Sequence, residues 1–510
     1  MTAKDKSGGT PPRGLLSVRY ICFYALLLIP FLSGGVVTGD EALLLSLVRG
    51  FDASTLSFGE YARSAAGWYI PHHILWFAIL YATSHIAAFL HFNSLLTEAV
   101  ISAETVAAAL GGIILCYVFL LRRMKMTPAR SAWTVLAFFA AGYGVFTFCL
   151  GGVVECYMFL VMSARLFLLE PQTDSDQARK LAIADAILIC LKAYSVIFLV
   201  MTLPLLRTSH QARQTYFGWL GALMAALVAI KLWLWNPSPI YYAGLANISA
   251  AELLSHFLQQ IFSPWTGLVF CLPILLVLFW VERARRRSLL FKAFGLAGCA
   301  AVFSLYDFFD GDIAGGRYIF PFLISLLPEI AGAISKLLDR DRRIAWLLPV
   351  GVLAFLPVTM LGFPFFPTGS IPDRGPCTPL HPAIYSWNIV MAKAVDKPEV
   401  EICFHDHRYV MSSRDVASPH LGLLRVGYLL EGGHSESYRE AAHNAFQRQH
   451  DAQGERLVTL LKSLGLGSPG LWLAMGLTPS ALLLLFSIIA AIKVNRRRAF
   501  PAPAIADNLS

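Results

Sequence analysis

The sequence predicts an all-α polytopic membrane protein with about twelve transmembrane helices and a small mixed α/β extracytoplasmic domain near the C-terminus. Three observations predict this fold class. Of the 510 residues, 56% are hydrophobic and only 14% are charged, and the mean hydropathy is +0.60; soluble domains carry about 25% charged residues. Several apolar runs reach the length of about 20 residues that spans a bilayer. Short basic clusters separate these runs.

The basic clusters set the topology, because Lys and Arg close to the ends of spans stay on the cytoplasmic side. Both termini then face the cytoplasm, and an even number of crossings separates successive clusters. These clusters account for the net charge of +9, so the charge predicts no nucleic-acid partner. They comprise the N-terminal segment and residues 122–130, 179–180, 207–213, 283–287, 336–343 and 493–498.

The first span is predicted at 19–38. It is long for a signal-peptide core and lacks an early cleavage site, so we expect it to be retained. The next apolar run, 73–91, contains several histidines and is predicted to lie on or dip into the outer leaflet instead of crossing. The second crossing is then 100–121, and residues 39–99 form a large first external loop.

Two further spans are predicted at 131–150 and 154–169. Segment 181–206 must leave the cytoplasm and return within about 26 residues, too few for two full spans at about 1.5 Å per residue. We therefore predict a hairpin of two short helices that breaks near Lys192. Irregular backbone at membrane depth needs cover, which places Lys192 in a cavity. The remaining spans are expected at 216–235, 267–281, 289–306, 318–335, 344–366 and 470–492.

This topology divides the chain into three regions. Residues 1–366 form a transmembrane module, 367–469 an extracytoplasmic domain, and 470–510 the last transmembrane helix with a cytoplasmic tail. In the extracytoplasmic domain we expect a strand at 400–404 and helices at 435–449 and 453–464. No internal repeat is evident, which disfavours a transporter built from inverted repeats.

The nine cysteines follow no metal-binding spacing. Most lie in apolar runs and behave there as small hydrophobes. Cys377 and Cys403 lie in the extracytoplasmic domain, where a disulfide between them and two free thiols are both open. Adjacent His72 and His73 would point apart on a helix, which favours interface or substrate contacts over a shared metal ion.

The cofactor is left undetermined. Asp307, Asp310 and Asp312 form either a solvated loop or a divalent cation site, since clustered carboxylates suit hard cations. His405 and His407 have the spacing of a zinc pair but no evident third ligand.

Few charged residues remain near the outer membrane boundary in this topology, and they come from separate segments. Charged groups held there are costly without water, a cation or a ligand, so they tend to be functional. A carboxylate takes a proton from an attacking hydroxyl, and Lys and Arg stabilise a departing phosphate. Such a group suits a reaction on a lipid-borne anionic substrate. It comprises Asp40, Glu41, Glu155, Lys192, Asp307, Asp310, Asp312 and Arg317.

Five short motifs, in order and spacing, make roughly the first 340 residues resemble the GT-C superfamily of membrane glycosyltransferases, in particular the aminoarabinose transferases and protein mannosyltransferases. The motifs are Gly39-Asp40-Glu41, Pro71-His72-His73-Ile74-Leu75, Gly152-Val153-Val154-Glu155-Cys156-Tyr157, Leu191-Lys192-Ala193-Tyr194 and Gly316-Arg317-Tyr318-Ile319-Phe320-Pro321. Each motif is loose by itself, and the likeness depends on their order together with the topology. The resemblance implies a polyprenyl-phosphate sugar donor, a site on the outer face and transfer of one sugar with inversion.

The resemblance also implies a role for each matching residue. Asp40 is the general base on the acceptor hydroxyl, and Glu155 is a second acid that orients acceptor or donor. Lys192 and Arg317 hold the donor phosphate, and Glu41 binds a sugar hydroxyl. Further substrate contacts are expected from His72, His73, Tyr157 and Tyr318.

Simpler interpretations stay open for the same residues. Asp40 and Glu41 can cap the helix that follows them. Glu155 can be a structural acid paired with Lys192, and Lys192 can instead extend to the membrane interface. Arg317 can be a juxtamembrane anchor.

The leading hypothesis is therefore a membrane glycosyltransferase that moves a sugar from polyprenyl phosphate to an envelope lipid, glycan or protein. We expect it in a bacterial inner membrane, because no eukaryotic retention signal is visible at the C-terminus. The alternatives are a transporter or flippase of lipid-linked sugars and an assembly subunit. A flippase needs charges distributed across the bilayer depth, whereas the charges singled out above gather at one side.

Overall fold

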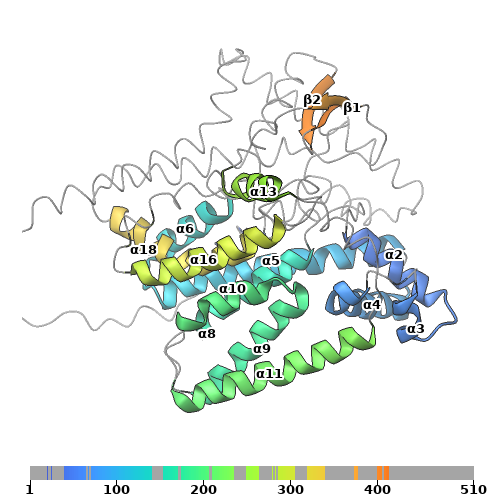
Figure 1. The fold of residues 1–510 in the computed structure, drawn as a ribbon, viewed down its shortest axis with the longest axis horizontal. Helices are drawn as coiled ribbons and strands as arrows, with labels where there is room; N and C mark the ends of the chain where they lie inside the picture. The colour runs from blue at the N-terminus through green and yellow to red at the C-terminus, as the bar shows by residue number, and fades with distance from the viewer. Residues whose placement is uncertain are drawn as a thin grey trace, which may run out of the picture.

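The described part of the chain is a bundle of α-helices with a small β-sheet lying apart from it (Figure 1). This computed structural model describes residues 20, 24–25, 40–64, 67, 70–92, 94–140, 153–169, 174–205, 209–234, 249–262, 278, 282, 285–304, 319–338, 373–376, 399–404 and 407–412. The bundle helices are α5 (Ser94–Arg122), α6 (Pro128–Ala140), α8 (Val153–Leu168), α9 (Ser175–Leu191), α10 (Ser195–Thr202), α11 (His210–Trp233), α16 (Arg286–Phe303), α17 (Phe320–Leu323) and α18 (Leu327–Leu338).

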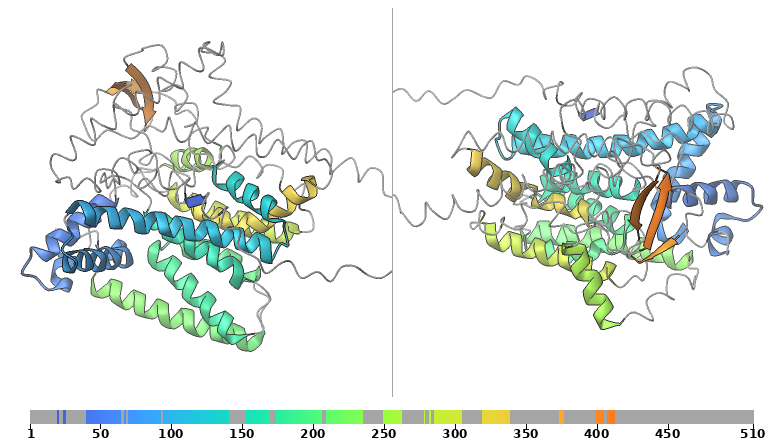
Figure 2. Two further views of the ribbon diagram at one scale, coloured as in Figure 1. Left: turned by 180° about the vertical axis from the view of Figure 1, so that it is seen from behind. Right: turned by 90° about the horizontal axis from the view of Figure 1, so that it is seen from above.

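Helix α5 runs the length of the bundle and packs along α8 (Figure 2). Small residues make this close packing possible. A Cβ atom added to Gly112 would overlap the ring of Phe159, and one added to Gly111 would lie 3.0 Å from Leu160 Cδ1. Glycines let neighbouring helix backbones approach closely, a device typical of membrane helices. The span predicted at 100–121 is thus present as α5, a long central helix of the bundle.

Two described helices are long and apolar enough to cross a membrane, Ala103–Arg122 within α5 and His210–Trp233, which is α11. They differ in surroundings, because α5 lies largely inside the bundle whereas α11 is mostly exposed. The exposed side chains of α11 include Phe217, Trp219 and Leu232, which is 67% exposed. Soluble proteins rarely expose an apolar surface this continuous. The outer face of α11 therefore suits contact with lipid.

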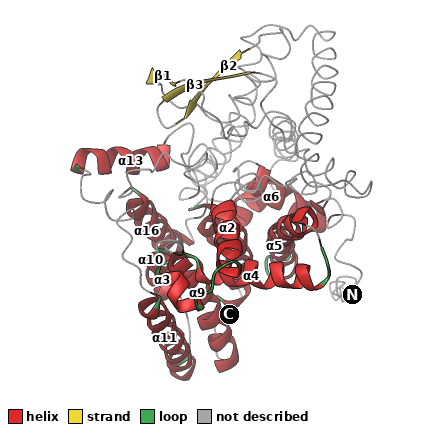
Figure 3. Cartoon of the chain, turned by 90° about the vertical axis from the view of Figure 1, so that its right-hand side faces the viewer, coloured by secondary structure: helices red, strands yellow, loops and turns green. Residues whose placement is uncertain are grey.

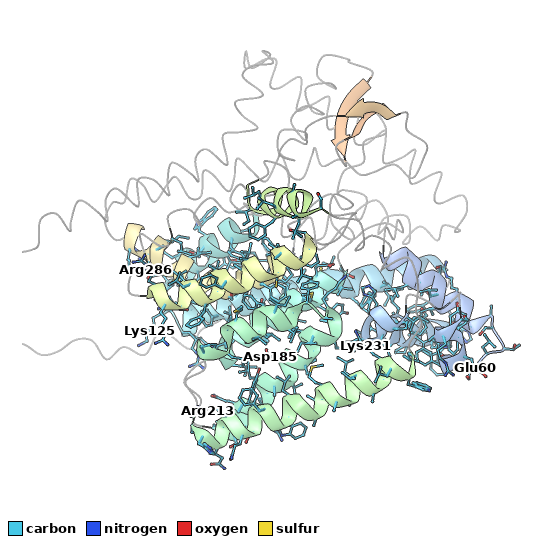
Figure 4. All side chains as sticks on the ribbon, viewed as in Figure 1. Glu60, Lys125, Asp185, Arg213, Lys231 and Arg286 are labelled. Carbon is cyan, nitrogen blue, oxygen red and sulfur yellow. The ribbon has the colours of Figure 1, made fainter. Side chains whose placement is uncertain are left out.

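Basic residues from three of the predicted clusters lie at one end of the bundle. Lys125, Arg213 and Arg286, from three predicted cytoplasmic clusters, lie toward one end of the long axis, and Glu60 and Lys231 lie toward the other (Figure 4). The helix ends predicted to share a membrane face thus lie together. We call the end with the three basic residues the basic end and the other the opposite end.

The hairpin predicted within 181–206 is confirmed. Helix α9 ends at Leu191 and α10 begins at Ser195, so the break falls at Lys192. Lys192 is extended, with φ −147° and ψ 116°, and its amide donates to the Leu188 carbonyl. The Ser195 hydroxyl donates to the same carbonyl at 3.1 Å. These bonds satisfy backbone groups at the break, where water is scarce.

The predicted external loop carries its own helices, α2 (Asp40–Asp52), α3 (Phe58–Arg63) and α4 (Ile74–Phe89), with the 3-10 turn η2 (Ile70–His72) before α4. Ser57 and Glu60 form a capping box at the start of α3, and these hydrogen bonds lower the pKa of Glu60. The helix expected at 73–91 is thus present as α4. The loop meets the bundle at the opposite end, where Phe58 lies 6.4 Å from Trp233, centroid to centroid.

Three strands lie between residues 373 and 412 and form an antiparallel sheet in the order β1-β3-β2 (Figure 3). They are β1 (Asp373–Pro376), β2 (Glu399–Phe404) and β3 (His407–Ser412). The strand expected at 400–404 is confirmed as β2, which pairs with β3 along its whole length. The helices expected at 435–449 and 453–464 and the spans at 344–366 and 470–492 lie outside the described residues.

The remaining described elements are η3 (Leu203–Leu205), α13 (Ala250–Phe262) and η7 (Ile324–Leu326). Helix α13 lies between the spans predicted at 216–235 and 267–281. Turn η7 joins α17 to α18 without a gap, so residues 320–338 form one nearly continuous helical segment. This segment corresponds to the span expected at 318–335.

Candidate functional site

Glu155 and Lys192 form an ion pair between α8 and the hairpin break. Glu155 lies in the first turn of α8 and is 2% exposed. Its Oε1 atom lies 3.9 Å from Lys192 Nζ, a separation too long for a hydrogen bond. Oε1 is buried and has no hydrogen bond to any residue that the structure describes. The structure therefore brings together two of the predicted site residues and leaves one carboxylate oxygen able to accept a hydrogen bond.

Two aromatic pairs involve residues close in sequence to this ion pair. The ring of Tyr157, two residues beyond Glu155, lies 5.2 Å from that of Trp76 in α4, centroid to centroid. Trp76 is 1% exposed. On the other side of the hairpin break, the Tyr194 ring meets Phe303 of α16 edge-on at 4.3 Å. Because Glu155 and Lys192 are largely buried, they interact more strongly than in water, where the dielectric constant is higher.

The predicted histidine pair lies at the entrance to α4. His73 is buried, and its backbone amide and carbonyl bond to Ile70 and Phe77 at 3.0 and 2.8 Å. His72 belongs to the turn η2, and its side chain lies outside the described residues. His73 thus precedes by three residues the tryptophan that contacts Tyr157, which brings this motif to the same region as Glu155.

Four predicted site residues are not placed. Asp40 and Glu41 begin α2, which packs against α4, but their side chains lie outside the described residues. Arg317 and Tyr318 also lie outside them. Their roles stay predictions.

The structure also contains a buried polar network that sequence reasoning missed. Arg165 Nε of α8 donates to Asp185 Oδ1 of α9 at 2.6 Å, and Arg165 Nη2 lies 3.4 Å from both Asp185 Oδ2 and the Thr202 hydroxyl of α10. The Tyr216 hydroxyl of α11 donates to Asp185 Oδ2 at 2.8 Å. Arg165 and Asp185 are fully buried. This network joins four helices.

A second missed network lies between α16 and α18. Lys292 Nζ donates to both carboxylate oxygens of Glu329, at 2.7 and 2.9 Å, and to the Ser325 carbonyl at 2.6 Å. Near the ends of these helices, Lys336 pairs with buried Glu282 at 2.6 Å. Arg165, Asp185, Lys292 and Glu329 lie within predicted spans and were not among the site residues predicted from the sequence. Single ionisable residues inside apolar runs, such as Arg165 and Asp185, were the available signal.

No group of three or more potential metal ligands occurs in the part of the chain that the structure describes. Three cysteines in that part are free thiols, Cys116, Cys190 and Cys299. The aspartates at 307–312, Cys377, and the side chains of Cys403 and His405–His407 lie outside that part. The divalent cation and disulfide alternatives therefore stay predictions.

Comparisons with known proteins give a distant structural likeness. No protein-family model matches the chain, and no curated protein matches it. Two crystal structures of ArnT from Cupriavidus metallidurans match over 92% of this chain and 77% of theirs: the apo state with 14% identity and a TM-score of 0.46, and the complex with undecaprenyl phosphate with 15% identity and a TM-score of 0.44. At these values the likeness assigns no residue role to this chain.

Proposed function

We propose that the protein is an integral membrane glycosyltransferase that moves a sugar from a polyprenyl-phosphate donor to an envelope lipid, glycan or protein. The site would lie on the outer face of a bacterial inner membrane. The observation that carries this proposal is the buried Glu155–Lys192 pair, held at a helix break with one acceptor oxygen open. Its lysine supplies charge for a donor phosphate, and its acid can orient a sugar or acceptor hydroxyl.

In the proposed reaction, Asp40 takes the proton of the acceptor hydroxyl as that oxygen attacks the anomeric carbon of the donor. The new glycosidic bond forms as the bond from the anomeric carbon to the phosphate oxygen breaks. The polyprenyl phosphate leaves with the bonding electron pair, and Lys192 and Arg317 stabilise its charge. A single displacement of this kind inverts the anomeric configuration. Glu155 orients the reacting groups.

The remaining predicted residues would line the substrate site. Glu41, His72 and His73 belong to the predicted external loop, and the Tyr157 ring lies beside that of Trp76 at a tilt of 50°. Tyr157 can bind a sugar by its ring face and by its hydroxyl, because aromatic side chains combine an apolar body with a polar group. Tyr318 would contribute from the start of the late span.

Asp40→Asn tests the proposal directly. Purified protein in proteoliposomes would be assayed for transfer from a synthetic polyprenyl-phosphate sugar to envelope lipid extract, with products identified by mass spectrometry. We expect the variant to lose transfer by a factor of about 10² or more, with normal expression and donor binding. Glu60→Gln is a matched control, because Glu60 is an exposed acid of the same loop that bonds only locally to Ser57. Wild-type transfer by Asp40→Asn would overturn the assignment.

A transporter or flippase of lipid-linked sugars is the second candidate. It is favoured by the ion pairs Arg165–Asp185 and Lys292–Glu329, which place charge at depths other than that of Glu155. Movement of a fluorescent lipid-linked sugar across the proteoliposome membrane separates the two functions. A flippase would move this lipid in the Asp40→Asn variant without forming product.

A further inference from the structure

Helix α8 meets the α9–α10 hairpin at two separate points. At one point Glu155 faces Lys192 at the hairpin tip. At the other, Arg165 bonds to Asp185 in one arm and Thr202 in the other. Glu155 and Arg165 are ten residues apart on one helix, which corresponds to about 15 Å. A rigid helix thus carries both contacts.

The contacts of Arg165 restrain both arms of the hairpin, α9 and α10. The guanidinium group is planar with donors in a rigid fork, so it sets angle as well as distance. Arg165 Nε bonds to Asp185 Oδ1 at 2.6 Å, and Nη2 is shared between Asp185 Oδ2 and Thr202 Oγ1. Thr202 Oγ1 also bonds to carbonyls of its own helix, at 3.0 Å to both Phe198 and Leu199. All three side chains are at most 1% exposed.

We propose that Arg165, Asp185 and Thr202 form a clamp that positions Lys192 against Glu155. We call these three residues the hairpin clamp. Lys192 lies at the break between two helices, where its backbone is extended, so the direction of its side chain depends on how the two arms are held. Arg165 of α8, the helix that also carries Glu155, holds α9 at Asp185 and α10 at Thr202, and these two contacts fix that direction. The clamp residues act through Lys192 and are positioning residues.

Positioning matters for the proposed transfer, on which the activity part of this inference rests. A displacement of about 1 Å at reacting groups can lower a rate about 10²-fold. Variants of the clamp should therefore lower kcat/KM for the polyprenyl-phosphate donor about 10- to 100-fold. The KM for the acceptor should stay unchanged, because Lys192 is assigned to the donor phosphate.

The test measures geometry separately from activity. Glu155→Cys and Lys192→Cys would be combined in a background in which the native cysteines are replaced by alanine, and linked in membranes with a short bismaleimide. Asp185→Asn and Thr202→Val are then added to this background. A milder variant, Arg165→Lys, keeps the charge but loses the two-sided contact. Donor kinetics are measured for the same three substitutions in the otherwise native protein.

Glu329→Gln is the matched control. It breaks a buried ion pair of similar geometry, Lys292 to Glu329 at 2.7 and 2.9 Å, between helices that are not arms of the hairpin. Asp185→Asn and Glu329→Gln should lower thermal stability to a similar extent, because each leaves a buried cation without its counter-charge. Only the clamp variants should lower the cross-linking yield and the donor kcat/KM.

Equal loss of cross-linking in Asp185→Asn and Glu329→Gln would overturn the clamp, and so would unchanged cross-linking in all three clamp variants. If Asp185→Asn fails to fold, Thr202→Val and Arg165→Lys decide the outcome. A wild-type protein that transfers no sugar would refute the proposed function alone, since the cross-linking yield still reports whether the clamp sets the position of Lys192.

Discussion

Replacing Lys192 with methionine, alone and together with Glu155→Gln, separates a functional ion pair from a structural one. The simpler interpretation of this pair is that it only holds α8 to the hairpin. Methionine keeps most of the length and volume of lysine, and glutamine keeps the shape of glutamate. Lys192→Met removes the positive charge, Glu155→Gln removes the negative charge, and the double variant removes both, each with little change in packing.

The size of the stability effect follows from the geometry. Two unit charges 3.9 Å apart attract by about 4 kcal/mol at an effective dielectric constant of about 20. Lys192 is 13% exposed and Glu155 3% exposed in their side chains, so solvent screens the pair little. Breaking a buried pair on one side costs about 3–5 kcal/mol. Since no hydrogen bond joins the two groups, we expect about 3 kcal/mol for each single variant.

The double variant should lose less than the sum of the single variants, because it leaves no uncompensated charge. We expect a coupling free energy of about 2–4 kcal/mol. Unfolding in detergent by heat and by denaturant, followed by tryptophan fluorescence, measures it. The same four proteins would be assayed for sugar transfer in proteoliposomes.

Activity decides between the two interpretations. If Lys192 holds the donor phosphate, the double variant regains stability but stays inactive, like Lys192→Met alone. If the pair is only structural, regained stability brings regained transfer. Wild-type transfer by the double variant would refute the assignment of Glu155 and Lys192 to the site.

Two further predictions concern packing and substrate contact. Gly112→Ala should destabilise the protein by about 1–3 kcal/mol, because the added methyl group would overlap the Phe159 ring. Gly221→Ala in α11 should instead stabilise it by about 0.5–1 kcal/mol, because the added methyl group would meet no atom within 4 Å. Thermal unfolding of both variants checks the difference. Tyr157→Phe keeps the ring pair with Trp76, so it should keep the fold and raise the KM for a substrate that bonds to the hydroxyl, as steady-state kinetics would measure. An unchanged KM would remove the Tyr157 hydroxyl from the proposed site.

The sequence was informative where chain length and charge constrain the backbone. Segment 181–206 had to turn back within the membrane, and the only charged residue near its middle is Lys192, so the break could be located. The strand at 400–404 was recognisable because alternating apolar residues follow the period of a strand. The pairing of Glu155 with Lys192 was an alternative that the residue types alone suggested.

The networks around Arg165 and Lys292 could not be predicted in the same way. Their formation depends on how each helix is rotated about its own axis. In a soluble helix the apolar stripe fixes that rotation, but helices α8 and α9 are apolar around most of their circumference. Arg165 and Asp185 were each visible as a charge inside an apolar run, yet nothing in the sequence paired one with the other.

These inner pairs also bear on the choice between transferase and transporter. Arg165 and Asp185 are fully buried, and each carboxylate oxygen of Asp185 accepts at least one hydrogen bond. The Asp185 carboxylate is therefore satisfied and holds helices together, while Arg165 Nη1 is buried without a hydrogen bond among the described residues. The Glu155–Lys192 pair differs, since its separation is 3.9 Å and Glu155 Oε1 has no hydrogen bond within the described ranges. A buried acceptor without a partner costs free energy that a bound hydroxyl would recover, so a substrate that donates a hydrogen bond would gain by binding at this pair.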